Sequence, residues 1–378
     1  LTGTPSAGRI SKVAITTGFG YQTPLAASGI ASVGNGISGV TTSISTVAED
    51  GQALTFSADG TKFLVGDKTG DPDAIFVGTL STAWAIDSVS GITSVSFNHD
   101  GGIHGMVFND DGTELWFTGT SNDSIKKITL ATPYDYTTNV GTSTNTVSSA
   151  DLSAIQDPVV SGPISPRGLG ISSTGSYVYV LELNGIVQVK LDTPWDLDSY
   201  NVGLSTYVQV DGSNGVTEFA GGPTLDNPRG ITFAHNDTYM YLVDLTLDAV
   251  LEYKLSTPGD VRTASYVRSQ SAPNNPTDCF FGDNKFFVLQ EESLSTLDYT
   301  GQPGTIYDVK LTGSGRGYQF KPGVSIASSI VGTAASITTV LGAGGTVTSF
   351  ILSEVGAGYS ASSPVSLLVT QPTGYSNM

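Results

Sequence analysis

Five polar side chains recur at one position of a repeated sequence, and they are the residues best suited to binding chemistry. They are Gln52, His104, Arg167, Arg229 and Thr277. Each precedes a glycine, or the residue that replaces it, in segments such as RGLGI and RGITF. Guanidinium groups bind carboxylates through paired, charge-assisted hydrogen bonds. The set predicts a site for a small anionic ligand or a sugar, unless each arginine pairs with a neighbouring acid such as Asp226 and locks the repeats together.

Three acidic residues in one loop are candidates for a calcium site. Asp67, Asp71 and Asp73 lie in the segment GDKTGDPDA. Carboxylate oxygens are ligands that Ca²⁺ prefers, although this spacing departs from the D-x-D-x-D-G loop with its terminal Glu. The sequence predicts no other cofactor.

Familiar catalytic motifs are missing from the chain. The three histidines, His99, His104 and His235, lack the H-E-x-x-H spacing of a zinc enzyme, and no G-x-S-x-G segment occurs. The single cysteine, Cys279, lies in the apolar run CFF, which is typical of a buried thiol. The sequence therefore predicts a protein that is not an enzyme. The alternative is an enzyme acting on polysaccharide, with two carboxylates that face each other across a cleft.

Charge and hydropathy exclude two classes of partner. The formal net charge of −18 disfavours nucleic acid, because binding to phosphates needs clustered Lys and Arg. No apolar run is long enough to cross a bilayer, so we expect no membrane insertion.

The five polar residues belong to a unit that occurs five times. Its first strand ends at Phe56, Phe108, Ile171, Phe233 and Phe281. A polar turn and a second strand follow, and four copies end their third strand with the pattern L-x-T-(P/A)-(aromatic/G). Four short strands per unit, repeated, are typical of propeller blades. We predict an all-β chain with a five-bladed β-propeller over residues 42–300, whose last blade is completed by the strand TTSISTV. An open solenoid or two sandwiches are the alternatives.

Two details of the repeat bear on function. The innermost strands of a propeller line its channel, so the five polar residues are expected to ring one mouth. Trp84, Tyr134 and Trp195 occupy equivalent positions after the third strand. Their equivalence indicates packing between blades, with stacking on carbohydrate only where the rings are exposed.

Small glycine-rich β-modules flank the propeller. Residues 8–25, 309–326 and 345–369 share a strand, the pattern G-x-G-Y, a proline and a further strand. The chain is thus predicted to divide into an N-terminal module and connector (1–41), the propeller (42–300) and a C-terminal module (301–378). The propeller would be inserted between modules that pack together as one stem.

The blade and module patterns together resemble virion structural proteins of tailed phages, especially marine ones. Units of the form RGI-x-F with a DGT turn and an STPWD ending resemble phage blade repeats, and G-x-G-Y…P resembles repeats of phage tail polypeptides. The resemblance implies a tail-fibre, baseplate or surface-decoration protein in an extracellular particle. Its partners would be other virion proteins, copies of itself and a host-surface glycan. A bacterial surface adhesin is the alternative.

Overall fold

The structure, a computed structural model, describes residues 27–33, 37–45, 47–68, 73–119, 121–156, 164–210, 219, 222–299, 304–318, 320–326, 332–359 and 365–370. The chain divides into two compact units, Gly36–Tyr299 and a second formed by Leu1–Asn35 with Thr300–Met378. The first boundary falls earlier than the predicted residue 41, because a strand of the larger unit already begins at Ile37. Among the described residues, no helix has the length and apolar character needed to span a bilayer.

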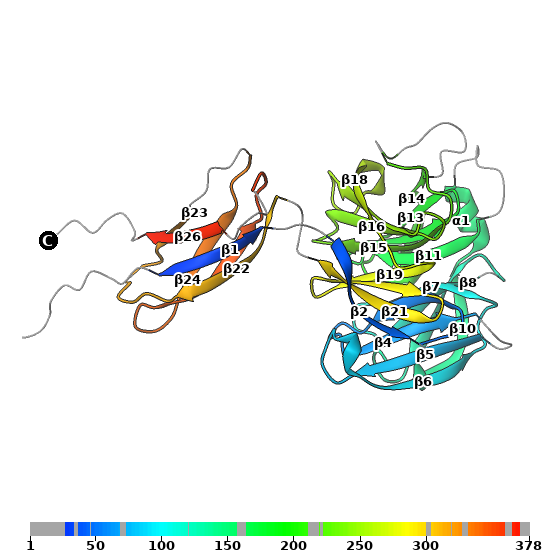
Figure 1. The fold of residues 1–378 in the computed structure, drawn as a ribbon. Helices are drawn as coiled ribbons and strands as arrows, with labels where there is room; N and C mark the ends of the chain where they lie inside the picture. The colour runs from blue at the N-terminus through cyan, green and yellow to red at the C-terminus, as the bar shows by residue number, and fades with distance from the viewer. Residues whose placement is uncertain are drawn as a thin grey trace, which may run out of the picture. The chain divides into compact units, whose positions relative to one another are not determined.

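The larger unit is a five-bladed propeller, which confirms the predicted fold class (Figure 1). Each blade is a four-stranded antiparallel sheet. Blade one holds β3 (Gly51–Phe56), β4 (Lys62–Asp67), β5 (Asp73–Leu80) and β6 (Val89–Phe97). Blade two holds β7 (Ile103–Phe108), β8 (Glu114–Gly119), β9 (Ile125–Leu130) and β10 (Asn139–Val147). Blade three holds β11 (Pro166–Ile171), β12 (Tyr177–Glu182), β13 (Gly185–Leu191) and β14 (Tyr200–Gln209), with the helix α1 (Ser149–Ile155) before it.

The last two blades complete the ring. Blade four holds β15 (Pro228–Ala234), β16 (Tyr239–Asp244), β17 (Ala249–Leu255) and β18 (Ala264–Ser271). Blade five holds β19 (Pro276–Gly282), β20 (Lys285–Gln290) and β21 (Ser293–Tyr299), and takes its outer strand from β2 (Ile37–Ser45). The inner strands β3, β7, β11, β15 and β19 each pack on the next, and β19 packs on β3. Because β2 pairs with β21, the first and last segments of the propeller close the ring together.

Glycines let the inner strands approach one another closely. A Cβ on Gly168 would lie 2.4 Å from the carbonyl oxygen of Arg229, and one on Gly105 would lie 2.4 Å from the backbone nitrogen of Leu169. Blade five has Asp278 at the equivalent position. Its buried carboxylate accepts hydrogen bonds from the backbone N–H of Leu54 in blade one (2.7 Å) and of Cys279 (2.8 Å). Asp278 thus links the last blade to the first.

The aromatic residues after the third strands cover hairpin glycines of their own blades. Trp84, Tyr134 and Trp195 have φ of 61°, 58° and 63°, and their rings lie over Gly60, Gly112 and Gly175. The backbone N–H of each aromatic residue donates to the carbonyl of the glycine that it covers. All three rings are half-buried, and Trp84 also stacks on Phe280 of blade five.

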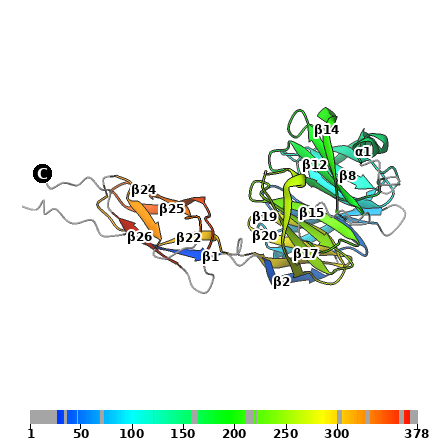
Figure 2. The same cartoon turned by 90° about the horizontal axis from the view of Figure 1, so that it is seen from above.

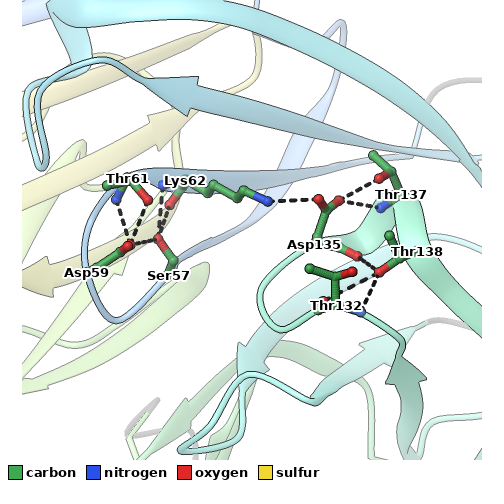
Figure 3. Close-up of polar contacts among 8 residues, drawn as sticks. All are labelled: Ser57, Asp59, Thr61, Lys62, Thr132, Asp135, Thr137 and Thr138. Carbon is green, nitrogen blue, oxygen red and sulfur yellow. Dashed lines mark hydrogen bonds and ion pairs between the residues drawn. The ribbon is translucent and has the colours of Figure 1, made fainter.

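Polar contacts join neighbouring blades at their surface. Figure 3 shows Lys62 of blade one forming an ion pair of 2.8 Å with Asp135, which caps the short helix Tyr136–Thr138 of blade two. Lys127 of blade two pairs with Asp198 of blade three at 2.6 Å. Both pairs are partly exposed, so each contributes at most about 1 kcal/mol.

The smaller unit is an internal duplication. Its strands are β1 (Ser28–Val33), β22 (Ile306–Gly313), β23 (Gly323–Ile326), β24 (Ser336–Leu341), β25 (Val347–Glu354) and β26 (Val365–Thr370), of which β23 is labelled in Figure 1 and the others in Figure 2. The pair β1–β22 and the hairpin β24–β25 have the same register, including both irregularities. The two halves also exchange equivalent hydrogen bonds, from Ile306 N–H to the Val355 carbonyl and from Val347 N–H to the Ser314 carbonyl, each 2.9 Å.

This equivalence defines where the propeller is inserted. In the second half, residues 342–346 form the turn between β24 and β25, and Gly342 N–H donates to the Thr346 carbonyl at 2.8 Å. In the first half, the whole propeller lies between the equivalent strands β1 and β22. The two flanks of the propeller therefore form one duplicated module, in which the propeller replaces a hairpin turn. The G-x-G-Y segment within residues 8–25 lies outside the described residues.

The tyrosines of the two described G-x-G-Y segments hold this module together. The Tyr318 hydroxyl accepts a hydrogen bond from Ala27 N–H (2.9 Å), and the Tyr359 hydroxyl accepts one from Ala335 N–H (2.7 Å). We expect Tyr318→Phe and Tyr359→Phe each to lower the free energy of unfolding of the module by about 1–2 kcal/mol, because the N–H of Ala27, which is buried, or that of Ala335, which is partly buried, loses its acceptor. Chemical denaturation measures this, with the exposed Tyr307→Phe as the control. Equal stability of all three variants would contradict the assignment.

Candidate ligand site at one mouth of the propeller channel

A backbone irregularity marks each of the five predicted site residues. Gln52, His104, Arg167, Arg229 and Thr277 are all second in their inner strands, and the register of the first two strands of every blade shifts at this residue. A bulge leaves one residue unpaired and redirects its side chain. Because the five inner strands are equivalent and form a ring, the bulges lie at the same end of the channel.

Three of the five residues, His104, Arg167 and Arg229, lie close enough to one another for their charges to interact. The charges of Arg167 and Arg229 both act on His104, and Arg167 acts on Arg229. Burial, followed by the charges of Lys68, Arg229 and Arg167, lowers the pKa of His104 to about 4. The imidazole is therefore neutral at neutral pH, whereas both guanidinium groups stay charged.

The cluster contains buried nitrogen atoms without hydrogen bonds. His104 Nδ1, Arg167 Nε and Arg229 Nε are inaccessible to solvent in the free chain, and none has a partner among the described residues. Most buried polar groups in proteins are paired, since an unpaired one costs about 1–3 kcal/mol. Three such atoms in one cluster show that the polar groups at this mouth are incompletely paired among the described residues.

The arginines are not paired with acids in the way the alternative from sequence requires. Arg167 Nη1 donates to the Asn227 side-chain oxygen at 2.6 Å, and within the described ranges neither arginine forms an ion pair. Asp226 contributes its backbone N–H to the Asp244 carboxylate at 2.9 Å. Burial is the main cause that lowers the pKa of both arginines, while Asp50, Asp244 and Glu291 raise the pKa of Arg229 and Glu182 raises that of Arg167.

Gln52 and Thr277 make bonds within their own blades. Gln52 Nε2 donates to the Asp50 carboxylate at 2.5 Å, and Thr277 Oγ1 donates to the Leu289 carbonyl at 3.3 Å. Thr277 is completely buried and Gln52 is 3% exposed. These two complete the ring of equivalent positions, but their polar atoms are already engaged.

The predicted calcium ligands have separate structural roles. Asp67 accepts hydrogen bonds from the backbone N–H of Glu49 (2.6 Å) and Asp50 (3.1 Å), and Asp73 accepts one from Gly102 (2.6 Å). Asp71 lies outside the described residues. Within the ranges that the structure describes, no group of three His, Cys, Asp or Glu side chains could hold a metal ion.

Sequence comparison places the chain in no known group, since no family model and no curated protein matches it. Solved structures with a similar fold include Myxococcus xanthus glutaminyl cyclase, at 13% identity and a TM-score of 0.42, covering 70% of this chain and 97% of that one. A Pseudomonas aeruginosa periplasmic gluconolactonase, PpgL, is 12% identical with a TM-score of 0.37, covering 92% of this chain and 100% of that one. A functionally unknown protein from Desulfotomaculum acetoxidans is 12% identical with a TM-score of 0.37, covering 85% and 89%. At these scores the likeness carries no argument about substrate or mechanism.

The prediction that the chain is not an enzyme was wrong as stated. It inferred inactivity from missing catalytic motifs in a propeller sequence. Propellers similar to this chain are named as a gluconolactonase and a glutaminyl cyclase. The missing motifs therefore do not exclude catalysis in this fold, because a channel can assemble reactive groups from separate blades.

Proposed function

We propose that the propeller binds an acidic glycan at the mouth that holds His104, Arg167 and Arg229. The observation that carries the proposal is the pair of guanidinium groups at equivalent inner-strand bulges, neither of which forms an ion pair among the described residues. A carboxylate or sulfate on a sugar offers several acceptor oxygens to the two guanidinium groups. The net charge of −18 repels anions from the surface as a whole, so we expect binding of an acidic sugar to depend on these two guanidinium groups.

Removing both arginines tests this site. We expect Arg167→Ala with Arg229→Ala to weaken binding of a galacturonic acid oligosaccharide about a hundredfold or more, since each charge-assisted hydrogen bond contributes about 1.5–3 kcal/mol. Isothermal titration calorimetry against the acidic oligosaccharide and its neutral galactose counterpart provides the measurement. Arg262→Ala is the matched control, because Arg262 is 62% exposed and pairs with Asp260. Equal affinity in the double variant and the wild type would remove the site from consideration.

We further propose that the chain is a structural component of a tailed-phage particle, in a tail fibre, baseplate or surface decoration. Two features support this: the blade and G-x-G-Y sequence patterns, and a duplicated module that carries the propeller in place of a turn. Such an arrangement suits the display of a binding head by a stem that contacts other virion proteins and copies of itself. Immunogold labelling of purified particles with an antibody against the propeller tests the location. Label on bacterial cells that lack phage would favour an adhesin instead.

An enzyme that acts on acidic polysaccharide is the second candidate, and His104 is the observation that favours it. The neutral imidazole of His104 lies beside two guanidinium groups that are suited to holding a sugar carboxylate. Incubation with acidic polysaccharide would then release new reducing ends, and His104→Gln would stop the release while binding persists. If the wild type releases none, binding alone is the function of the site.

A further inference from the structure

The opposite end of the channel contains a cavity that the acidic site does not use. It has a volume of about 250 Å³ and is lined by the far ends of the inner strands, together with Trp195 and Asp237. The rings of Phe233 and Phe281 form part of its wall, and Ser172 lies beside them. Trp195, Phe233 and Phe281 are each partly exposed. An aromatic, partly open cavity with a few polar groups has the character of a small-molecule site.

The cavity lies beside the two blades that lack the aromatic residue after the third strand. In blades one and two, this residue covers the last aromatic ring of the inner strand. Trp84 stacks on Phe56 with centroids 5.5 Å apart, and Tyr134 packs edge-on against Phe108 at 5.1 Å. Neither Phe56 nor Phe108 is among the residues that line the cavity.

Blades four and five differ at this point. Blade four has Gly259 where blades one to three have an aromatic residue. The backbone N–H of Gly259 donates to the carbonyl oxygen of Asp237, just as that of Trp195 donates to the carbonyl oxygen of Gly175. Blade five has no such segment, because the propeller ends at Tyr299. Their inner-strand rings, Phe233 and Phe281, both face the cavity. Tyr179 packs against Phe233 with ring centroids 4.2 Å apart, and Tyr299 packs against Phe281 at 5.0 Å. Both phenylalanines nevertheless line the cavity.

Polar groups are fixed at the edge of this space. Asp237 stands at the position that glycine holds in blades one to three, with φ of 60°. Its carboxylate accepts hydrogen bonds from the backbone N–H and the hydroxyl of Ser173, both at 2.8 Å. Each carboxylate oxygen has capacity for a second donor. Asp237 is therefore held in place and is still able to accept a hydrogen bond from a ligand hydroxyl.

We propose that this cavity binds a neutral pyranose ring, stacked on the ring of Trp195 and hydrogen-bonded to Asp237. The apolar face of a sugar packs on an aromatic ring, and its hydroxyls need fixed acceptors at the edge. The carboxylate at the rim and the overall negative charge disfavour an acidic sugar here. This site is separate from the arginine mouth and does not depend on the function proposed for it.

Restoring the missing ring gives a direct test. Gly259→Trp recreates the sequence STPW, and the backbone should accept it, since Gly259 has φ of 75° and the equivalent aromatic residues have φ of 58–63°. The equivalent rings lie over glycines, whereas Asp237 has a side chain at that place, so we expect the new ring to be displaced across the cavity. A Cβ at Gly259 meets only the Tyr179 hydroxyl, at 3.2 Å, within 3.4 Å. Gly259→Ala is the matched control, which adds the Cβ without a ring. The probes are the methyl glycosides of glucose, galactose and mannose, with indole as the aromatic comparison.

Saturation-transfer NMR reports the outcome. We expect at least one methyl pyranoside to receive saturation from the wild type and from Gly259→Ala, and none to receive it from Gly259→Trp. Trp195→Phe provides a second measurement, because it keeps an aromatic ring at this position but removes the indole fluorescence. The pyranoside should alter tryptophan emission in the wild type and not in this variant. Transfer to indole alone, no transfer to any pyranoside, or equal transfer from Gly259→Trp and the wild type would each overturn the proposal.

Discussion

Gly168→Ala is expected to lower the free energy of unfolding of the propeller by about 3 kcal/mol or more. The added Cβ would lie 2.4 Å from the carbonyl oxygen of Arg229, a backbone atom of the neighbouring inner strand. A side chain can rotate away from such a contact, but a ring of five inner strands has no free direction in which to move. Overpacking in a well-packed core costs about 1–3 kcal/mol, and more where the neighbours cannot shift.

A second glycine gives the matched control for this prediction. Gly91 lies in the outer strand β6 of blade one, and a Cβ there would meet no atom within 4 Å. Gly91→Ala should leave stability unchanged or raise it by about 0.5 kcal/mol. Urea denaturation compares the two variants. Equal stability of Gly168→Ala and Gly91→Ala would show that the inner strands are not closely packed.

Asp278 is expected to produce the second large effect. Asp278→Leu leaves the buried N–H of Leu54 without an acceptor and removes a link between blades five and one. We expect a loss of about 2–4 kcal/mol, since an unpaired buried donor costs about 1–3 kcal/mol and the larger side chain adds strain. Asp87→Leu, at an exposed position of blade one, is the control for introducing a leucine. A loss no greater than in this control would contradict the role of Asp278 in closing the ring.

The same residue makes stability depend on pH. Complete burial raises the pKa of Asp278 well above its ordinary value, so the folded chain holds this proton more tightly than the unfolded chain. The stabilisation is fully present below the ordinary pKa of aspartate and is lost as pH rises towards the raised pKa. The difference in unfolding free energy between the wild type and Asp278→Asn should therefore fall as pH increases from 4. A constant difference would show that Asp278 is ionised in the folded state.

The regular part of the fold could be predicted from sequence because the sequence pattern of one blade occurs five times. The alternation in segments such as RGITF and YMYLV, with polar turns between them, gave both the strands and their number. The sequence also predicted that the propeller is inserted between two flanks that pack together, but the exact point of insertion could not be derived in the same way. It depends on the register of β1 with β22 matching that of β24 with β25, and strand pairing across a whole domain leaves no local signal.

The candidate site was predicted in its positions but not in its contacts. The five residues occupy the same position of the repeat, which predicted that they lie on one ring. The repeat could not show that Gln52 and Thr277 form hydrogen bonds within their own blades. Those bonds depend on the rotamers of individual side chains and on neighbours such as Asp50, which differ between blades. Departures from the repeat were more informative than the repeat itself. The glycine in STPG is visible in the sequence, yet only the packed structure shows the cavity beside it.

The most direct test of the proposed function is a crystal structure of the protein soaked with a galacturonic acid disaccharide. We predict density for the sugar at the mouth formed by the inner-strand bulges, with its carboxylate in contact with the guanidinium groups of Arg167 and Arg229. The account would be contradicted if the channel mouth held no sugar at a saturating ligand concentration. It would also be contradicted if the sugar were bound with its carboxylate turned away from both arginines.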